Sequence, residues 1–263
     1  MSTIYSFNIN KREQKIVRIS DINSFLKVFN ELINNDNYIF RGLSKDDEKY
    51  PKIIRNNKTF SLEREVHLLV EFEKYCGLYG SVRNCWEFIA LAQHHGLDTR
   101  LIDFSKNPFV AAFFSLYNSY AVEYVVYAAD KGDYMNVKDI NFHVRNGCYL
   151  GGMSEMSFSE KIKHNYSVLL EDGRIVILEP NYANERIFAQ QGLFLISPLV
   201  DKTKIDEIYN NMPIKIVIDK SARKVIWEYL SKNNFDEYHL MPDLSSACIE
   251  INRTTKWGVI AWK

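Results

Sequence analysis

The spacing of apolar residues changes along the chain from a helical period to short strand-like runs. Residues 20–33 and 84–95 carry apolar side chains at the intervals of one helix face, with Ser20 as the predicted N-cap of the first helix. Later in the chain the apolar runs are short and rich in β-branched and aromatic residues, as in residues 122–129 and Ile214–Ile218. Helices followed by strands are typical of the α+β class. We therefore predict N-terminal helices packed on a central, mostly antiparallel sheet.

The sequence contains no repeat, low-complexity tract or linker that would divide it. We therefore expect a single domain over residues 1–263, with its core at about residues 20–250. Lysine plus arginine equals aspartate plus glutamate, with 33 of each. This balance argues against nonspecific nucleic-acid binding as the main function, because such proteins usually carry a basic excess. The first residues lack the apolar core of a signal peptide, and the longest apolar runs are too short to span a membrane. A cytoplasmic protein without membrane contact is expected.

Polar residues are densest between Gln93 and Asp103, directly after a helix with the composition of a buried one. So much polarity against a core is costly unless the groups are paired. The segment is therefore either a functional site or a structural hydrogen-bond network, and the residues alone leave both open. Its histidines, His94 and His95, are adjacent on a helix and point about 100° apart, so they cannot readily chelate one ion. We expect no metal.

Arg41 follows a short predicted strand over residues 38–40 and precedes Gly42. A strand that ends in Arg-Gly presents a planar guanidinium at a sheet edge, beside a glycine that lets a ligand approach. Such a fork suits pyrophosphate or a carboxylate. The alternative is a buried arginine paired with an acidic side chain, for which Asp103 is the obvious candidate. The chain has no G-x-S-x-G elbow and no glycine-rich phosphate loop, which excludes the α/β-hydrolase, kinase and dinucleotide-fold interpretations.

Five strings of the sequence belong together as one family pattern: YIFRG at residues 38–42, PKIIR at 51–55, AQHHGLDTRLIDF at 92–104, ERIFAQQGLF at 185–194 and MPDL at 241–244. They closely resemble the motifs of the FRG domain family, which is named for its Phe/Tyr-Arg-Gly motif. Asp98 and Phe104 replace the proline and the tryptophan that the family usually has at these positions. The resemblance spans roughly residues 20 to 250 and rests mainly on a long A-Q-H-H-G-x-x-T-R-L-x-D string. Membership of the family implies no particular activity.

A fainter similarity is to ADP-ribosyltransferases of the Arg-Ser-Glu type, and it implies an ADP-ribosyltransferase-like fold. The site of these enzymes begins with a strand ending in Tyr-Arg-Gly, which residues 38–42 resemble. It continues with a strand ending in serine and a helix patterned A-x-x-F-A, which the segment from Ser105 onward resembles. The third element should carry a catalytic glutamate on a late strand. In this chain Gln191 stands in the corresponding stretch, and Glu179 and Glu185 are the alternatives.

This resemblance implies that NAD is the substrate, and it assigns roles in NAD cleavage. Arg41 would hold the NAD phosphates or the nicotinamide ribose, and Ser105 would hydrogen-bond that ribose. Gln191 or a carboxylate would contact the ribose 2′-hydroxyl and stabilise the oxocarbenium-like state. His95 or Asp103 would orient Arg41 or take a proton from the acceptor. The other residues expected to bind NAD are Gly42, His94, Thr99 and Arg100.

The leading hypothesis is an NAD-dependent ADP-ribosyltransferase, or an NAD glycohydrolase with the same cleft. Similar domains occur as toxin-like modules of bacterial toxin–antitoxin and phage-defence systems. This implies a macromolecular acceptor, either a nucleic acid such as mRNA or a protein. A neutralising antitoxin or a chaperone is the expected partner, with the apolar tail at residues 256–263 as its docking segment. A non-enzymatic nucleotide- or phosphate-binding module is the first alternative, and a nuclease that uses His94, His95 and Asp103 is the second.

Overall fold

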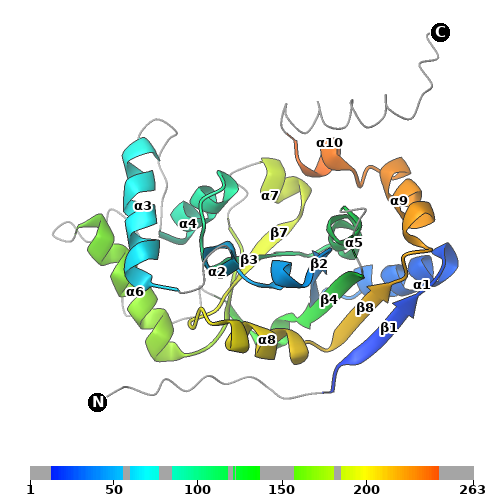
Figure 1. The fold of residues 1–263 in the computed structure, drawn as a ribbon, viewed down its shortest axis with the longest axis horizontal. Coiled ribbons are helices and arrows are strands. Elements are labelled where there is room, and N and C mark those ends of the chain that lie inside the picture. Colours follow the sequence, from blue (N-terminus) through cyan, green and yellow to red (C-terminus); the bar gives the residue numbers. More distant parts are fainter. Residues whose placement is uncertain are drawn as a thin grey trace, which may run out of the picture.

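The computed structural model describes residues 13–55, 60–76, 85–117, 121, 123–136, 157–180 and 185–242. These residues build one eight-stranded sheet surrounded by ten α-helices and two short 3-10 helices (Figure 1). The predicted α+β class and the mostly antiparallel sheet are confirmed. Within these ranges, no helix combines the length and the hydropathy that a membrane span requires. The tail at residues 256–263, predicted as a docking segment, lies outside the described residues.

The strands lie in the order β1-β8-β4-β2-β3-β7-β6-β5. Neighbouring strands are antiparallel except in the pairs β1–β8 and β5–β6. The strands predicted over residues 122–129 and Ile214–Ile218 are β4 and β8. The bounds are β1 (Lys15–Ile19), β2 (Tyr38–Leu43), β3 (Leu101–Ser105), β4 (Tyr124–Asp130), β5 (Met135–Asn136), β6 (Val176–Leu178), β7 (Gly192–Ile196) and β8 (Ile214–Ile218).

The first helix begins close to its predicted start, but Asp21 and not Ser20 is its N-cap. The Asp21 carboxylate accepts hydrogen bonds from the backbone N–H groups of Asn23 at 2.8 Å and Ser24 at 3.0 Å. The α-helices are α1 (Ile22–Ile33), α2 (Lys52–Arg55), α3 (Leu62–Cys76), α4 (Cys85–His94), α5 (Pro108–Leu116), α6 (Phe158–Asp172), α7 (Glu185–Ala189), α8 (Lys202–Asn210), α9 (Arg223–Lys232) and α10 (Glu237–Leu240), and the 3-10 helices are η1 (Asp46–Lys49) and η2 (Lys131–Asp133).

One face of the sheet carries two separate apolar clusters. The first includes Phe40 and Val126 and packs against α1, α5 and α9; the second includes Leu101 and Phe194 and packs against α3, α4 and α6. These two sets of helices stand at the right and the left of Figure 1. On the opposite face a third cluster, which includes Ile102, packs against α2 and α8. The boundary between the two clusters of the first face lies between the neighbouring strands β2 and β3, in the middle of the sheet.

Candidate functional site

Strands β2 and β3 are neighbours in the sheet, yet they are joined through one residue pair, Phe40 with Ser105. On its other side β2 pairs with β4 over six residues, and β3 pairs with β7 over five. The two central strands therefore separate after Phe40. We call the opening between residues 41–43 of β2 and residues 101–104 of β3 the β2–β3 gap. Polar backbone groups at such a gap need partners other than the neighbouring strand.

The Arg41 side chain fills part of the β2–β3 gap. Its Nη1 donates to the Asp103 carbonyl and lies 3.6 Å from an oxygen of the Asp103 carboxylate, while Nη2 donates to the Glu48 carbonyl at 2.7 Å. About one tenth of the side chain is exposed, and its Nε is buried with no acceptor among the described residues. Arg41 lies within β2, which continues to Leu43, and not after the strand as predicted. The pairing with Asp103, one of the two sequence interpretations of Arg41, is therefore observed. Nε remains as a donor of the guanidinium without an acceptor among the described residues.

Asp103 is held in place from a second direction by a chain of hydrogen bonds. Gln93 Nε2 donates to Asp103 Oδ1 at 2.7 Å, and the Thr99 hydroxyl donates to Gln93 Oε1. Gln93 and Thr99 are buried, whereas 63% of the Asp103 side chain is exposed. Within the polar string predicted from sequence, Thr99 and Gln93 thus form a structural network that orients one solvent-facing carboxylate.

A pocket of about 670 Å³ surrounds the β2–β3 gap. This volume lies within the range of small-molecule sites. Its walls come from β2, β3, the start of β7, the segment from Ser44 to Arg55, the end of α4, α5 and α7. Thr99, Arg100 and Gln191 are not among the residues that line it. The predicted site residues that do line it are Arg41, Gly42, His94, His95, Asp103 and Ser105.

Ser105 joins the end of β3 to the turn that precedes β7. Its hydroxyl donates to the Gln190 carbonyl at 2.7 Å and accepts from the backbone N–H of Asn107 at 2.9 Å. Only 5% of Ser105 is exposed. The hydroxyl is therefore engaged by backbone groups, and it links the end of β3 to the turn before β7 beside the pocket.

The three residues considered in place of the expected glutamate all lie outside the pocket lining. Gln191 has a left-handed φ of 47° and an exposed side chain, and its carbonyl accepts from the backbone N–H of Lys106 at 3.0 Å. Glu179 accepts from the Lys106 ammonium at 2.8 Å. Glu185 is exposed at the first position of α7. The neighbouring Gln190 does line the pocket, so the third element reaches the site through this residue.

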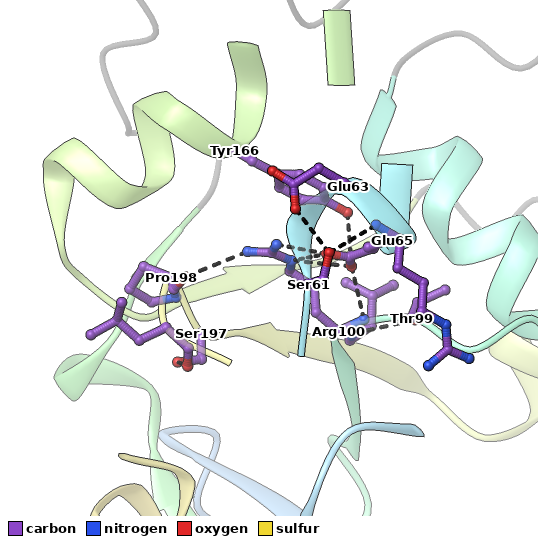
Figure 2. Close-up of polar contacts among 11 residues, drawn as sticks. Ser61, Glu63, Glu65, Thr99, Arg100, Tyr166, Ser197 and Pro198 are labelled. Atoms are coloured by element: carbon purple, nitrogen blue, oxygen red, sulfur yellow. Dashed lines mark hydrogen bonds and ion pairs between the residues drawn. The ribbon is translucent and has the colours of Figure 1, made fainter. Parts of the chain in front are cut away.

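Arg100 has a buried carboxylate partner in place of the expected ligand. It is 2% exposed, and its Nη2 lies 2.6 Å from Oε2 of Glu65; the other oxygen of this carboxylate, Oε1, accepts from the Tyr166 hydroxyl at 3.0 Å (Figure 2). The guanidinium lies 3.7 Å from the centre of the Tyr166 ring. Burial alone would lower the pKa of Arg100, but the Glu65 charge raises it above its ordinary value. Arg100 therefore ties the segment before β3 to α3 and α6, and neither it nor Thr99 faces the pocket.

The two histidines lie side by side at the end of α4. The centres of the His94 and His95 rings are 5.0 Å apart, and the ring planes are nearly perpendicular, at 82°. His95 is exposed, and both residues line the pocket. In the part of the chain that the structure describes, no group of three or more His, Cys, Asp and Glu side chains could hold a metal ion.

Arg55 also lines the pocket, although it is not among the site residues predicted from sequence. Its Nη2 donates to the Glu48 carbonyl at 2.9 Å, the same oxygen that accepts from Arg41. Lys52 and Arg186 are further cationic residues of the lining. The signal that could have identified Arg55 is its place at the end of the PKIIR string, which belongs to the family resemblance.

Gly42 faces the backbone of α5. A Cβ atom at this position would lie 1.8 Å from the Ala111 carbonyl oxygen, far inside van der Waals contact. Because the obstacle is helix backbone, Gly42→Ala should force α5 away from β2 and lower the free energy of unfolding by about 1 to 3 kcal/mol. Urea-induced unfolding measures this change. Close packing of α5 on β2 thus requires a glycine here, whatever binds in the pocket.

Gly192 provides the matched control for this prediction. It also lies in the sheet and lines the pocket, but a Cβ atom added there meets its nearest atom at 3.5 Å, an ordinary contact. Gly192→Ala should change the free energy of unfolding by no more than about 0.5 kcal/mol. Equal unfolding midpoints for the two variants would contradict the packing role of Gly42.

In the comparison with known proteins, one family model matches part of the chain. Residues 36–123 match the family model of the FRG domain, which confirms the resemblance predicted from sequence over this range. The matched range contains β2, α4, β3 and α5, and with them Arg41, Arg55, Asp103 and Ser105. No curated protein and no solved structure matches the chain.

Proposed function

With the FRG domain as the premise, we propose that this chain is an NAD-dependent ADP-ribosyltransferase whose active site is the pocket at the β2–β3 gap. NAD is the substrate, and a macromolecule, either RNA or protein, is the acceptor. Such an activity suits a toxin-like module of a bacterial toxin–antitoxin or phage-defence system, with an antitoxin or a chaperone as partner. The observation that carries the proposal is the convergence of Arg41, Ser105 and Gln190 on one pocket.

This convergence is a product of the strand order. The three residues come from β2, β3 and the turn before β7, which are distant in sequence but consecutive in the sheet. The residue pairs Phe40–Ser105 and Ser105–Gly192 align them across the three strands. They are the same three elements, in the same chain order, that resemble the Arg-Ser-Glu site in the sequence. The match of order and position supports the proposed activity.

The charge of the pocket suits a dinucleotide. Clefts with an excess of one charge attract ligands of the opposite sign, and a diphosphate carries two negative charges. The four cationic side chains of the lining outnumber its two carboxylates; the cations are Arg41, Lys52, Arg55 and Arg186, and the carboxylates are Glu48 and Asp103.

Asp103 is the carboxylate best placed to act in the reaction. The Glu48 carboxylate is already engaged, because it accepts from the backbone N–H groups of Ser44 at 2.8 Å and Lys45 at 3.2 Å. Asp103 keeps 63% of its side chain exposed and is oriented by Gln93. In the proposed step the bond between C1′ of the ribose and the nicotinamide nitrogen breaks, and nicotinamide leaves with the electron pair. The acceptor oxygen or nitrogen bonds to C1′, and its proton passes to Asp103.

Two other functions compete with the transferase. The glutamine at the third element favours a non-enzymatic nucleotide- or phosphate-binding module, which would bind NAD without cleaving it. A nuclease is the other, since His94, His95 and Asp103 all line the pocket. Cleavage of RNA or DNA in the absence of NAD distinguishes the nuclease from the transferase and from the binding module.

Arg41→Lys should lower kcat/KM for NAD cleavage about 10- to 100-fold, because the lysine keeps the charge but loses the planar fork that bonds a phosphate or a carboxylate in two places. The measurement is release of nicotinamide from labelled NAD by the purified chain, alone and with cell lysate or RNA. Transfer of label to protein or to RNA identifies the acceptor class.

Arg18→Lys is the matched control, because Arg18 is exposed on β1 at the far edge of the sheet. Circular dichroism and the melting temperature must show that both variants are folded, since Arg41 also holds two backbone carbonyls. If NAD is not cleaved in any mixture but raises the melting temperature, the binding module replaces the transferase. Absence of both effects rules out NAD as the ligand.

A further inference from the structure

Two guanidinium groups share one acceptor at the wall of the pocket. Nη2 of Arg41 and Nη2 of Arg55 donate to the Glu48 carbonyl oxygen, at 2.7 and 2.9 Å. Arg55 is fixed further by Nε and Nη2, which donate to the Tyr50 carbonyl at 3.3 and 2.8 Å. Both cations therefore lie within hydrogen-bond distance of a single neutral atom, and their positions are set by backbone groups.

This arrangement places two positive charges close together, and the ion pair that they form within the described part of the chain is the one between Arg41 and the largely exposed Asp103. Among the described residues, no carboxylate comes within ion-pair distance of Arg55, and the nearest to Arg41 is Asp103 at 3.6 Å. Burial and the nearby charge of Arg41 lower the pKa of the Arg55 guanidinium, and the carboxylates of Glu48, Asp47 and Asp103 only partly oppose this change. Glu48 supplies its carbonyl to the two arginines, while its carboxylate caps the Ser44 backbone. Like charges held this close repel each other unless an anion binds between them.

We propose that Arg55 is a second phosphate-binding residue, which together with Arg41 forms a subsite for the diphosphate of a dinucleotide. Adjacent guanidinium forks suit two linked phosphates, since each fork can bond phosphate oxygens in a bidentate manner. Lys52, in the same wall of the pocket, adds a third positive charge. The inference rests on the proposed function, because it assigns part of NAD to part of the same pocket. It narrows the ligand to compounds that carry a diphosphate.

The competing explanation is that Arg55 only anchors the chain between Tyr50 and Glu48. The two roles differ in what a neutral side chain does. Arg55→Gln removes the charge but keeps an amide that can donate to a carbonyl. If Arg55 is only an anchor, Arg55→Gln should leave ligand affinity unchanged. If Arg55 binds phosphate, the same change should weaken ligand binding.

The test is calorimetric titration of the full chain with ADP-ribose, pyrophosphate and adenosine. Arg55→Gln should weaken the binding of ADP-ribose and pyrophosphate about 10- to 100-fold, the effect of losing one hydrogen bond to a charged group, and should leave adenosine binding unchanged. Arg18→Gln makes the same charge change on β1 and should leave all three affinities unchanged. In the unmodified chain, ADP-ribose binding should weaken with added salt more steeply than adenosine binding.

The outcomes separate this inference from the proposed function. Unchanged ADP-ribose affinity in a folded Arg55→Gln variant overturns the subsite, even where NAD is cleaved. Weakened ADP-ribose affinity in that variant, with no nicotinamide release by the unmodified chain, supports the subsite and overturns the transferase. If Arg55→Gln does not fold, equal salt dependence of ADP-ribose and adenosine binding in the unmodified chain overturns the subsite.

Discussion

Replacing Asp103 by asparagine should lower the rate of NAD cleavage about 10²- to 10⁴-fold, the usual contribution of a general base. Asparagine has the same shape and can still accept the hydrogen bond from Gln93, but it carries no charge and cannot take the proton of the acceptor. Stability should change little, because most of the Asp103 side chain is exposed. Single-turnover assays with labelled NAD, in the mixture that gives the highest rate, measure the effect on chemistry.

Asp36→Asn is the matched control, since Asp36 is exposed in the turn after α1 and does not line the pocket. Its rate should equal that of the unmodified chain. Gln191→Ala and Glu179→Gln test the assignments made from sequence. If one of these two causes the large loss and Asp103→Asn does not, the catalytic role belongs to that residue, and the pocket must rearrange to admit it.

Replacing Glu65 by glutamine should lower the free energy of unfolding by about 3 to 5 kcal/mol, as is typical when one partner of a buried ion pair is removed. Glu65 and Arg100 are 0% and 2% exposed, so the change leaves a guanidinium shielded from water without its carboxylate. The Tyr166 hydroxyl also loses a charged acceptor (Figure 2). Burial raises the pKa of Tyr166 well above its ordinary value, so the phenol stays neutral. Equilibrium unfolding in urea measures the loss.

Glu207→Gln removes a carboxylate from a pair in which both side chains are about one third exposed, at 37% for Lys204 and 33% for Glu207. Its cost should be at most about 1 kcal/mol. Replacing both members of the buried pair, Glu65→Leu with Arg100→Met, should restore part of the stability lost in Glu65→Gln, because apolar residues need no counter-charge. A Glu65→Gln variant as stable as Glu207→Gln would show that the pair does not hold α3 to the segment before β3.

The fold class and several elements could be predicted from apolar periodicity. In strongly patterned segments such as α1 and β4, the spacing of apolar residues indicates both the type of element and the face that is buried. Elements with a weak apolar pattern, such as β1 and α6, could not be predicted in this way. β1 includes Ile16, which is 61% exposed, and its place is set by parallel pairing with β8, about 200 residues further along the chain. α6 contributes Ile162, Tyr166 and Leu169 to the core, but polar residues dominate between them. Such segments are helical or extended mainly because of what they pack against.

The site could be located from the sequence, but the roles of its residues could not all be assigned. Arg41 and Asp103 were predicted as possible partners because each stands out locally. Arg100 stands out equally, yet its carboxylate partner is Glu65 on a different helix, and nothing in the local sequence reveals this pairing. Arg55 comes close to Arg41 only because the chain folds back between Leu43 and Lys52. Tertiary pairing, which local spacing does not encode, decides which charged groups face the pocket and which face the core.

The separation of β2 from β3 has a mechanical consequence. It divides the sheet into two halves, β1-β8-β4-β2 and β3-β7-β6-β5, which share one backbone residue pair, the contacts of Arg41 and the third apolar cluster on the opposite face. A ligand that contacts Arg41 on one half and Asp103 on the other would hold the two halves together across this seam. Ligand binding in the pocket would then stabilise the contact between the two halves, and separation of the halves would weaken ligand binding. Amide hydrogen exchange beside the seam should slow as the pocket fills, and the empty protein should begin to open there.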